Sequence, residues 1–224
     1  MLVSTFLADS AAESRTPTPL GRVADDTLGL LHQAIALVLL LLAPLMLGVA
    51  WRIWRVDGAP IFFGHHRVGR EGRLFRCLKF RTMRRDAEQV LAGVLANDPV
   101  LRTAWERDQK LPDDPRITPV GHFLRKTSLD ELPQLINVLR GEMRLVGPRP
   151  ITRPELTRYG RVRWLYMQVP PGITGLWQVS GRNCTTYAER VALDQAYINA
   201  ASPLLDLKIL LRTVAVVVTG HGAG

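Results

Sequence analysis

Residues 34–51, AIALVLLLLAPLMLGVAW, contain no charged side chain. A straight helix of this length rises roughly 27 Å at about 1.5 Å per residue, which nearly spans the apolar part of a bilayer. Pro44 lies mid-run, where it removes one backbone hydrogen bond and clashes with the preceding turn, so the helix is expected to bend there. The sequence therefore predicts a bent span or two short arms that enter and leave by the same face. An uninterrupted leucine run favours both over a buried core helix.

The segments on either side of this apolar run differ in character. Residues 1–25 are rich in Ser, Thr, Ala and Pro without periodicity, so a disordered tail is predicted. Two aspartates, rather than a basic cluster, precede the run, which argues against a secretory signal. Just beyond the run, arginines flank a tryptophan, as is typical of a membrane–water interface. We therefore expect a membrane helix over 26–56 and a globular domain over 57–224.

The 224-residue chain has a formal net charge of +9, and its basic residues are concentrated. Residues 52–85 hold ten Lys/Arg against Asp57 and Glu71. Such a segment attracts an anionic partner, which could be lipid headgroups, nucleic acid or the diphosphate of a substrate, and charge alone does not choose among them. Cys77 and Cys184 match no metal or redox spacing, so packing roles in a reduced cytosolic setting are predicted.

The globular part is predicted to be a mixed α/β fold of the α+β kind, with a small sheet and surrounding helices. The runs IFFGHHRVG and RLFRCLKF, separated by three turn residues, predict a β-hairpin within 60–80. The other predicted elements are helices at about 84–110, 128–143, 185–200 and 204–218, and loops at 146–150 (VGPRP) and 170–183 (PPGITGLWQVSGRN). The last helix carries Lys208 and Arg212 among leucines and is predicted to lie in the membrane interface. Neither glycine fingerprint of nucleotide-binding folds is present.

Asp130 and Glu131 are adjacent carboxylates that precede Pro133, a residue that favours the first turn of a helix. Because Ser128-x-x-Glu131 matches a capping box, a structural capping role is one interpretation. Carboxylates at adjacent helix positions diverge, so they do not suit a glycosidase, whose two groups face each other across a sugar. A nucleophile beside a metal ligand suits them better, because a carboxylate can attack phosphorus and Mg²⁺ accepts one or two carboxylates plus phosphate oxygens.

Several side chains near these carboxylates could bind a phosphorylated substrate. Arg125 and Lys126 precede them, and Arg149 lies between two prolines that stiffen its loop. In the second loop, Trp177 and Arg182 could stack on a base or grip a phosphate, while packing of the loop beneath the indole is an equal alternative. The five histidines have no Cys or carboxylate at zinc-like spacing, so surface or packing roles are predicted.

Long motifs give the chain a specific resemblance to a known family. The strings that resemble the bacterial sugar transferase family, in its order, are KFRTM (79–83), DPRIT (114–118), LRKTSLDELPQL (124–135), GEMRLVGPRP (141–150) and PGITGLWQVSGRN (171–183). The similarity covers about residues 28–219. Members of this family are monotopic phosphoglycosyl transferases of the bacterial inner membrane, with a cytoplasmic catalytic domain and a re-entrant helix–break–helix. The resemblance implies the same element here, with its break at Pro44.

The resemblance also implies a two-step reaction that begins exopolysaccharide synthesis on undecaprenyl phosphate. Asp130 would attack the sugar-linked phosphate of a UDP-sugar and release UMP, and the lipid phosphate would then take the phosphosugar from the aspartate. Glu131 would bind Mg²⁺. By motif position, the residues implied to line the active site are Lys79, Arg125, Arg149, Arg182 and Asp206.

Several choices stay open at this point. The strings GHHRVG (64–69) and CLKFRTM (77–83) are most similar to short family members of the succinoglycan type, which favours UDP-galactose, with UDP-glucose next. Ala43-Pro44 replaces the family's common Ser-Pro at the membrane break. The alternative is a non-enzymatic basic protein that binds anionic lipid or nucleic acid through 52–85. Its aromatic residues follow apolar β-type patterns rather than an exposed stacking series, which argues against nucleic acid. A homodimer is left open.

Overall fold

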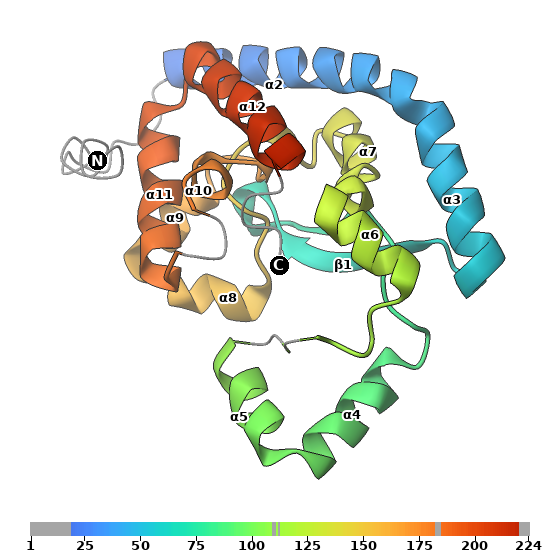
Figure 1. Ribbon diagram of the computed structural model, residues 1–224. Helices are drawn as coiled ribbons and strands as arrows, with labels where there is room; N and C mark the ends of the chain where they lie inside the picture. Colours follow the sequence, from blue (N-terminus) through green and yellow to red (C-terminus); the bar gives the residue numbers. More distant parts are fainter. Residues whose placement is uncertain (1–18, 109–110, 112, 182–184, 220–224) are drawn as a thin grey trace.

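The computed structural model describes residues 19–108, 111, 113–181 and 185–219, in which helices surround two small sheets (Figure 1). In chain order, the elements are α2 (Pro19–Leu39), η1 (Leu40–Leu42), α3 (Ala43–Asp57), β1 (Phe62–Val68), η2 (Arg70–Gly72), β2 (Leu74–Phe80), α4 (Ala87–Asn97), α5 (Pro99–Asp108), α6 (Pro119–Thr127), η3 (Leu129–Glu131), α7 (Gln134–Leu139), β3 (Arg144–Val146), α8 (Arg153–Arg158), η4 (Gly160–Val162), α9 (Arg163–Tyr166), β4 (Gly172–Thr174), α10 (Leu176–Val179), α11 (Tyr187–Ala200) and α12 (Pro203–Thr219). The predicted combination of helices with a small sheet is confirmed.

The apolar amino-terminal segment folds as two helices with a bend between them. The 3-10 turn η1 interrupts the segment at Leu40–Leu42, and α3 then runs in a new direction (Figure 1). Pro44 lies in the first turn of α3, where its missing N–H breaks no helical hydrogen bond. The predicted break is therefore observed, just ahead of the proline. Helix α2 begins at Pro19, inside the predicted tail, and residues 1–18 of that tail lie outside the described residues.

Strands β1 and β2 form the predicted hairpin. They pair antiparallel, from Phe62 opposite Phe80 to Val68 opposite Leu74. The turn between them contains Gly72 at a φ of +74°, a left-handed conformation that glycine adopts without steric cost. This hairpin places β2, with the KFRTM motif at its end, in the centre of the molecule beside α7 and η3.

Two segments predicted as single helices are each divided in two. The segment 84–110 forms α4 and α5, because Pro99 begins a new helix and the Asp98 carboxylate accepts hydrogen bonds from two backbone N–H groups of its first turn. The segment 128–143 forms η3 and α7. Gly141, the predicted stop, follows α7 with a φ of +73°.

Of the two regions predicted as loops, 146–150 is a loop after Val146, the last residue of β3, whereas 170–183 contains a strand and a short helix, so the second prediction was wrong. β3 and β4 pair in parallel, with Arg144 opposite Gly172 and Val146 opposite Thr174, and α10 follows β4. The two backbones touch at glycines, since a Cβ atom added to Gly172 would lie 2.1 Å from the Gly147 nitrogen. Strands of three residues carry no readable alternation, which is why the sequence pattern missed them.

The largest hydrophobic cluster joins the amino-terminal helix to the globular part. Its buried members include Ala36 of α2, Val138 of α7, Trp177 of α10 and Ile209 of α12. Cys77 is buried in the same cluster, which confirms its predicted packing role, and Cys184 lies outside the described residues. Helix α2 is therefore packed against the protein along one side.

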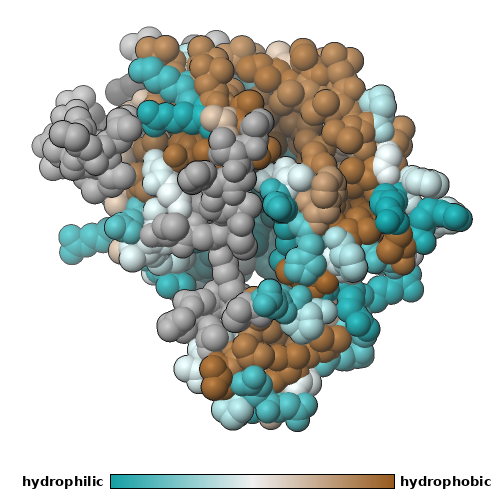
Figure 2. All heavy atoms as spheres, in the orientation of Figure 1, coloured by the Kyte–Doolittle hydropathy of each residue, from teal (hydrophilic) through white to brown (hydrophobic). Residues whose placement is uncertain are grey.

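The opposite side of the amino-terminal helices is exposed and apolar. Leu37, Leu41 and Leu47 are 64%, 78% and 70% exposed, and Leu207 and Leu211 of α12 are also exposed. Figure 2 shows apolar side chains gathered over the side of the molecule formed by α2, α3 and α12. By length and composition, the helical stretch Gly29–Asp57 is also sufficient to cross a membrane. An exposed apolar surface of this kind indicates contact with lipid or with another protein.

Candidate active site

Asp130 and Glu131 lie in η3, the short turn that links α6 to α7. Ser128 ends α6 with a left-handed φ of 56°, and its side chain makes no capping hydrogen bond. The backbone N–H of Glu131 donates to the Ser128 carbonyl at 3.2 Å. The capping-box interpretation was therefore wrong, and the turn presents two neighbouring carboxylates ahead of α7.

Lys79 at the end of β2 reaches both carboxylates. Its Nζ lies 2.6 Å from Glu131 Oε1 and 3.8 Å from Asp130 Oδ2. Burial acts to lower the pKa of Lys79, but Glu131 and Asp130 outweigh it, so the pKa is raised above its ordinary value. Lys79 is therefore a permanent cation at the carboxylate pair.

Asp130 is the more buried of the two carboxylates, at 8% exposed. Burial raises the pKa of Asp130 to about 6; Lys79 and Arg125 oppose this rise, and the Glu131 charge adds to it. A carboxylate with a pKa in this range is still ionised at neutral pH, yet it is more basic than an ordinary aspartate. These are properties expected of a nucleophile.

Arg125 comes to the site from α6. Its Nε donates to the Thr82 hydroxyl at 2.9 Å, and its charge acts on Asp130. Close contact between α6 and the KFRTM motif makes this possible, because a Cβ atom at Gly121 would lie 2.0 Å from the Thr82 carbonyl oxygen. A side chain at position 121 would therefore push α6, and Arg125 with it, away from Thr82.

The DPRIT motif runs beside KFRTM. The Thr118 N–H donates to the Thr82 carbonyl at 3.0 Å, and Met83 pairs with Ile117 in an isolated bridge. At the start of DPRIT, Asp114 holds Arg116 through several hydrogen bonds between the two side chains. The structure therefore brings three of the quoted motifs together around η3.

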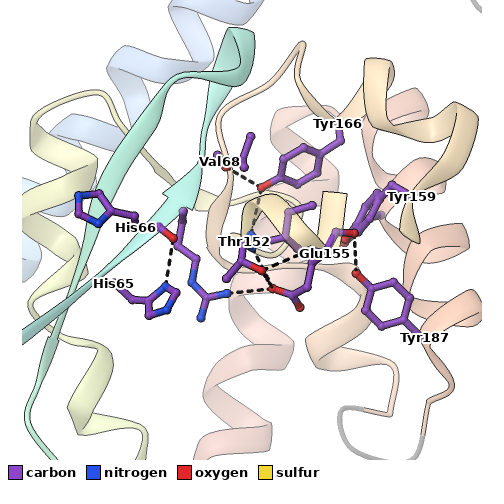
Figure 3. Close-up of polar contacts among 11 residues, drawn as sticks. His65, His66, Val68, Thr152, Glu155, Tyr159, Tyr166 and Tyr187 are labelled. Carbon is purple, nitrogen blue, oxygen red and sulfur yellow. Dashed lines mark hydrogen bonds and ion pairs between the residues drawn. The ribbon is translucent and has the colours of Figure 1, made fainter. Parts of the chain in front are cut away.

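Arg149 lies in the loop that follows β3. Hydrogen bonds made by Ile151, two residues further on, hold this loop in place. The Val68 N–H donates to the Ile151 carbonyl at 2.8 Å, while the Tyr166 hydroxyl accepts from the Ile151 N–H and donates to the Val68 carbonyl (Figure 3). Nearby, Glu155 accepts from Arg67 and from Thr152 (Figure 3). These contacts tie the Arg149 loop to β1.

The guanidinium of Arg149 lies over the Trp177 ring, 5.3 Å from its centroid, and its charge acts on Lys79. Trp177 is 4% exposed and belongs to the core, so the packing alternative for its loop is the one observed. Sequence reasoning missed Arg190 of α11, whose guanidinium lies 4.5 Å from the same ring centroid. No local pattern marks Arg190, because Trp177 and Arg149, which relate it to the site, come from α10 and from the loop after β3.

Among the described residues, one predicted site residue, Asp206, is not brought to this cluster. Arg182 lies outside the described residues. Asp206 is 3% exposed; its Oδ2 lies 3.0 Å from His32 Nε2, and its Oδ1 accepts from the Tyr197 hydroxyl at 2.8 Å. The described contacts of Asp206 thus join α2, α11 and α12. His32 is buried at 1% exposed, in agreement with a packing role.

The described residues contain no group of three or more His, Cys, Asp or Glu side chains arranged to hold a metal ion. The pair Asp130 and Glu131 alone is a donor set of the kind that Mg²⁺ shares with substrate phosphate oxygens and water. The residues present therefore fit a metal that binds together with a phosphorylated substrate, and they do not fit a closed structural site.

Several cations of the basic segment 52–85 bind groups of the chain itself. Arg81 donates to the backbone carbonyls of Asp57 and Gly58, and Arg84 pairs with Asp86. Together with the Lys79 pairing, these contacts show that the segment is not a uniform outward-facing cationic surface. They weaken the alternative of a general lipid- or nucleic-acid-binding protein.

The fold and the motifs that meet at η3 place the chain among the sugar transferases. The profile of the family described as bacterial sugar transferase matches residues 24–220. The chain belongs to the bacterial sugar transferase family. Among its relatives, the undecaprenyl-phosphate galactose phosphotransferase of Salmonella typhimurium is 51% identical over 187 residues, and the exopolysaccharide production protein ExoY of Sinorhizobium fredii is 44% identical over 205 residues. The UDP-glucose:undecaprenyl-phosphate glucose-1-phosphate transferase of Escherichia coli is 38% identical over 186 residues.

The relatives differ in length. The match covers 84% of this chain but 39% of the Salmonella protein, and 80% of this chain but 37% of the Escherichia coli protein. With ExoY it covers 92% of this chain and 90% of the relative. The chain therefore spans about two fifths of the longer relatives and nearly all of the shorter one.

Proposed function

We propose that this protein transfers a hexose 1-phosphate from a UDP-sugar to undecaprenyl phosphate, through a covalent phosphosugar on Asp130, and so initiates exopolysaccharide synthesis. The observation that carries the proposal is the buried Asp130 carboxylate, held next to Glu131 and the cations Lys79 and Arg125. The names of the relatives support a sugar phosphate donor and a lipid phosphate acceptor. UDP-galactose is the favoured donor and UDP-glucose the next, because galactose is named for a relative at 51% identity and glucose for one at 38%.

In the first step, an Asp130 oxygen attacks the sugar-linked phosphorus of the donor. The bond between this phosphorus and the bridging oxygen breaks, and UMP leaves with the electron pair. In the second step, an oxygen of the lipid phosphate attacks the same phosphorus, the bond to Asp130 breaks, and the carboxylate is restored. Lys79, Arg125 and Arg149 supply positive charge where the phosphoryl oxygens gather negative charge.

Mg²⁺ is the proposed cofactor, and Glu131, with Asp130 beside it, would hold the ion. When bound, Mg²⁺ would neutralise phosphate charge and favour departure of UMP. In the structure Lys79 contacts Glu131 at 2.6 Å and supplies a cation at the same carboxylate. Lys79 thereby opposes the rise that burial causes in the pKa of Asp130.

The amino-terminal segment is proposed to be a re-entrant membrane element, with the catalytic domain on the cytoplasmic face. Both ends of this segment, in α2 and in α3, contact the same globular part. At one end His32 of α2 contacts Asp206 at 3.0 Å. At the other, Ile53 of α3 is fully buried and Arg81 donates to the Asp57 carbonyl at 2.7 Å. A spanning helix would place its ends on opposite faces, which this double attachment opposes.

Cysteine labelling tests the re-entrant arrangement. Cysteines replacing Gln33 and Arg55, in a background without Cys77 and Cys184, are expected to react with a membrane-impermeant maleimide from the cytoplasmic side only. Labelling of one position from each side would show a spanning helix and overturn the re-entrant proposal. A known periplasmic cysteine in another protein serves as the control for sidedness.

Nucleotide release tests the function itself. Purified protein in lipid nanodiscs with Mg²⁺ and undecaprenyl phosphate is expected to release UMP from UDP-galactose, more slowly from UDP-glucose, and from neither when EDTA removes the metal. Faster release from UDP-glucose would reverse the sugar order and leave the reaction class intact. Absence of UMP release across a panel of UDP-sugars would contradict the proposed function.

The raised pKa of Asp130 predicts a pH dependence. The attacking form is the carboxylate, which is present above its pKa of about 6, so kcat/KM for UMP release is expected to fall as the pH is lowered through this value. The measurement is made at subsaturating Mg²⁺, because a bound cation would lower the pKa of the carboxyl. A rate that stays constant down to about pH 5 would contradict an Asp130 nucleophile with this pKa.

A further inference from the structure

Two arginines from separate elements share one aromatic ring. Arg149, from the loop after β3, and Arg190, from α11, lie 5.3 Å and 4.5 Å from the centroid of Trp177. Because Trp177 is buried in the core, it is a fixed support for both guanidinium groups. Their convergence depends on the contact between α10 and α11.

Within the part of the chain that the structure describes, neither arginine is neutralised by an ion pair. The Nε atoms of both, and the Trp177 Nε1, are buried donors that lack a hydrogen-bond partner there. Burial and the neighbouring Arg149 charge lower the pKa of Arg190. Two partly buried like charges with unused donors are costly to hold together, unless an anion binds between them.

Two carboxylates, Glu155 and Asp194, lie near the arginines, and the side chain of each makes hydrogen bonds to other groups. Glu155 accepts hydrogen bonds from Arg67 at 3.1 Å and from Thr152 at 2.9 Å. Asp194 is fully buried and accepts from the Tyr159 hydroxyl at 2.7 Å. Burial raises the pKa of Asp194 to about 7, although Tyr159, Arg190 and Arg149 oppose this rise. Asp194 is therefore close to half protonated at neutral pH and balances the charge of the two arginines only in part. These two side chains therefore leave the positive charge of the arginine pair incompletely balanced.

The arginine pair lies near enough to the reaction centre for Arg149 to act electrostatically on Lys79. The Arg149 charge acts on Lys79, and Lys79 in turn contacts Glu131 and lies near Asp130. A guanidinium group presents forked N–H donors that match the oxygens of a phosphate, and arginine is therefore the common choice where such a group is bound. Both the position of the arginine pair and the donor geometry of its guanidinium groups therefore favour a phosphate ligand.

We propose that Arg149 and Arg190, supported by Trp177, bind a phosphoryl group of a substrate next to the Asp130 centre, and that Arg190 is a substrate-binding residue. This inference rests on the proposed function. Two substrates carry this chemistry, the diphosphate of the UDP-sugar and the monoester of the polyprenyl phosphate. The two half-reactions separate them, since only the first uses the nucleotide and only the second uses the lipid.

The test compares Arg190→Gln and Arg190→Lys with wild type and with Arg163→Gln. Arg163 is a matched control, because its guanidinium lies 5.1 Å from the ring centroid of Trp164, a tryptophan that is exposed. The first half-reaction is followed as UMP release without lipid over a range of UDP-sugar concentrations. The second is followed by chasing labelled enzyme with increasing polyprenyl phosphate. Thermal unfolding is recorded for each protein.

For Arg190→Gln we expect the half-saturating concentration of one substrate to rise about 10-fold or more, with a smaller rise for Arg190→Lys, because lysine keeps the charge but loses the fork. A rise in the first half-reaction assigns the site to the nucleotide diphosphate, and a rise in the second assigns it to the lipid phosphate. The unfolding temperature is expected to stay within about 4 °C of wild type, and Arg163→Gln is expected to match wild type throughout.

Unchanged half-saturation in both half-reactions would overturn the inference and leave Arg190 as a packing residue of Trp177 and Tyr187. If Arg190→Gln does not fold, Arg190→Lys decides by the same criterion. An inactive wild type would show that the proposed function has failed, whereas an active variant with wild-type half-saturation would show that this inference alone has failed.

Discussion

Replacement of Asp130 by asparagine is expected to abolish UMP release, by at least about 10⁴-fold, as for loss of a covalent nucleophile. The amide keeps the shape of the side chain but cannot form the acyl phosphate. Wild type incubated with radiolabelled UDP-sugar and no lipid should retain acid-stable, hydroxylamine-labile label on the protein, and Asp130→Asn should retain none.

The control for this prediction is Asp113→Asn, which changes an exposed aspartate by the same chemistry and is expected to have wild-type activity. Label that persists in Asp130→Asn would place the covalent bond elsewhere. If the wild-type protein releases UMP only when lipid is present, the result would favour direct transfer in a ternary complex and contradict the two-step mechanism.

Replacement of Glu131 by glutamine is expected to cost about 10²- to 10³-fold in rate, together with the dependence on Mg²⁺. The amide is a poor metal ligand, and Lys79 loses its partner at 2.6 Å. Because the Glu131 charge contributes to the raised pKa of Asp130, its removal lowers that pKa, so the loss cannot be attributed to protonation of the nucleophile. The measurement is UMP release over a range of Mg²⁺ concentrations.

Glu71→Gln is the matched control, because Glu71 pairs with exposed Arg73 in the hairpin turn. This variant should keep the wild-type response to Mg²⁺. A normal Mg²⁺ response in Glu131→Gln would exclude Glu131 as the metal ligand and transfer that role to a different group.

The sequence predicted those features that depend on neighbouring residues. The hairpin followed from two β-rich runs around a turn, and the break near Pro44 followed from the backbone chemistry of proline. The adjacency of Asp130 and Glu131 was visible directly. Lys79 had no local signal beyond its basic surroundings, and its place at the carboxylates was implied only by the resemblance of the KFRTM string.

Features made by distant segments could not be predicted in this way. Asp206 and His32 are 174 residues apart, and nothing near either position indicates their contact. Arg190 reads as an ordinary charge on an amphipathic helix until α11 packs against α10 and meets the Arg149 loop. The parallel pair β3 and β4 failed for a different reason, since each strand is too short for a pattern.

Because α2 and α3 are both attached to the globular part, the proposed re-entrant segment would enter the bilayer to a fixed depth. The bend at Leu40–Leu42 could not move along the bilayer normal without breaking the His32 contact at one end or the Arg81 contacts at the other. Bilayer thickness, which tilts or stretches spanning helices, would then act on this protein only through the leaflet it enters. The height of Asp130 above the headgroups would be a property of the fold, set before any lipid substrate arrives.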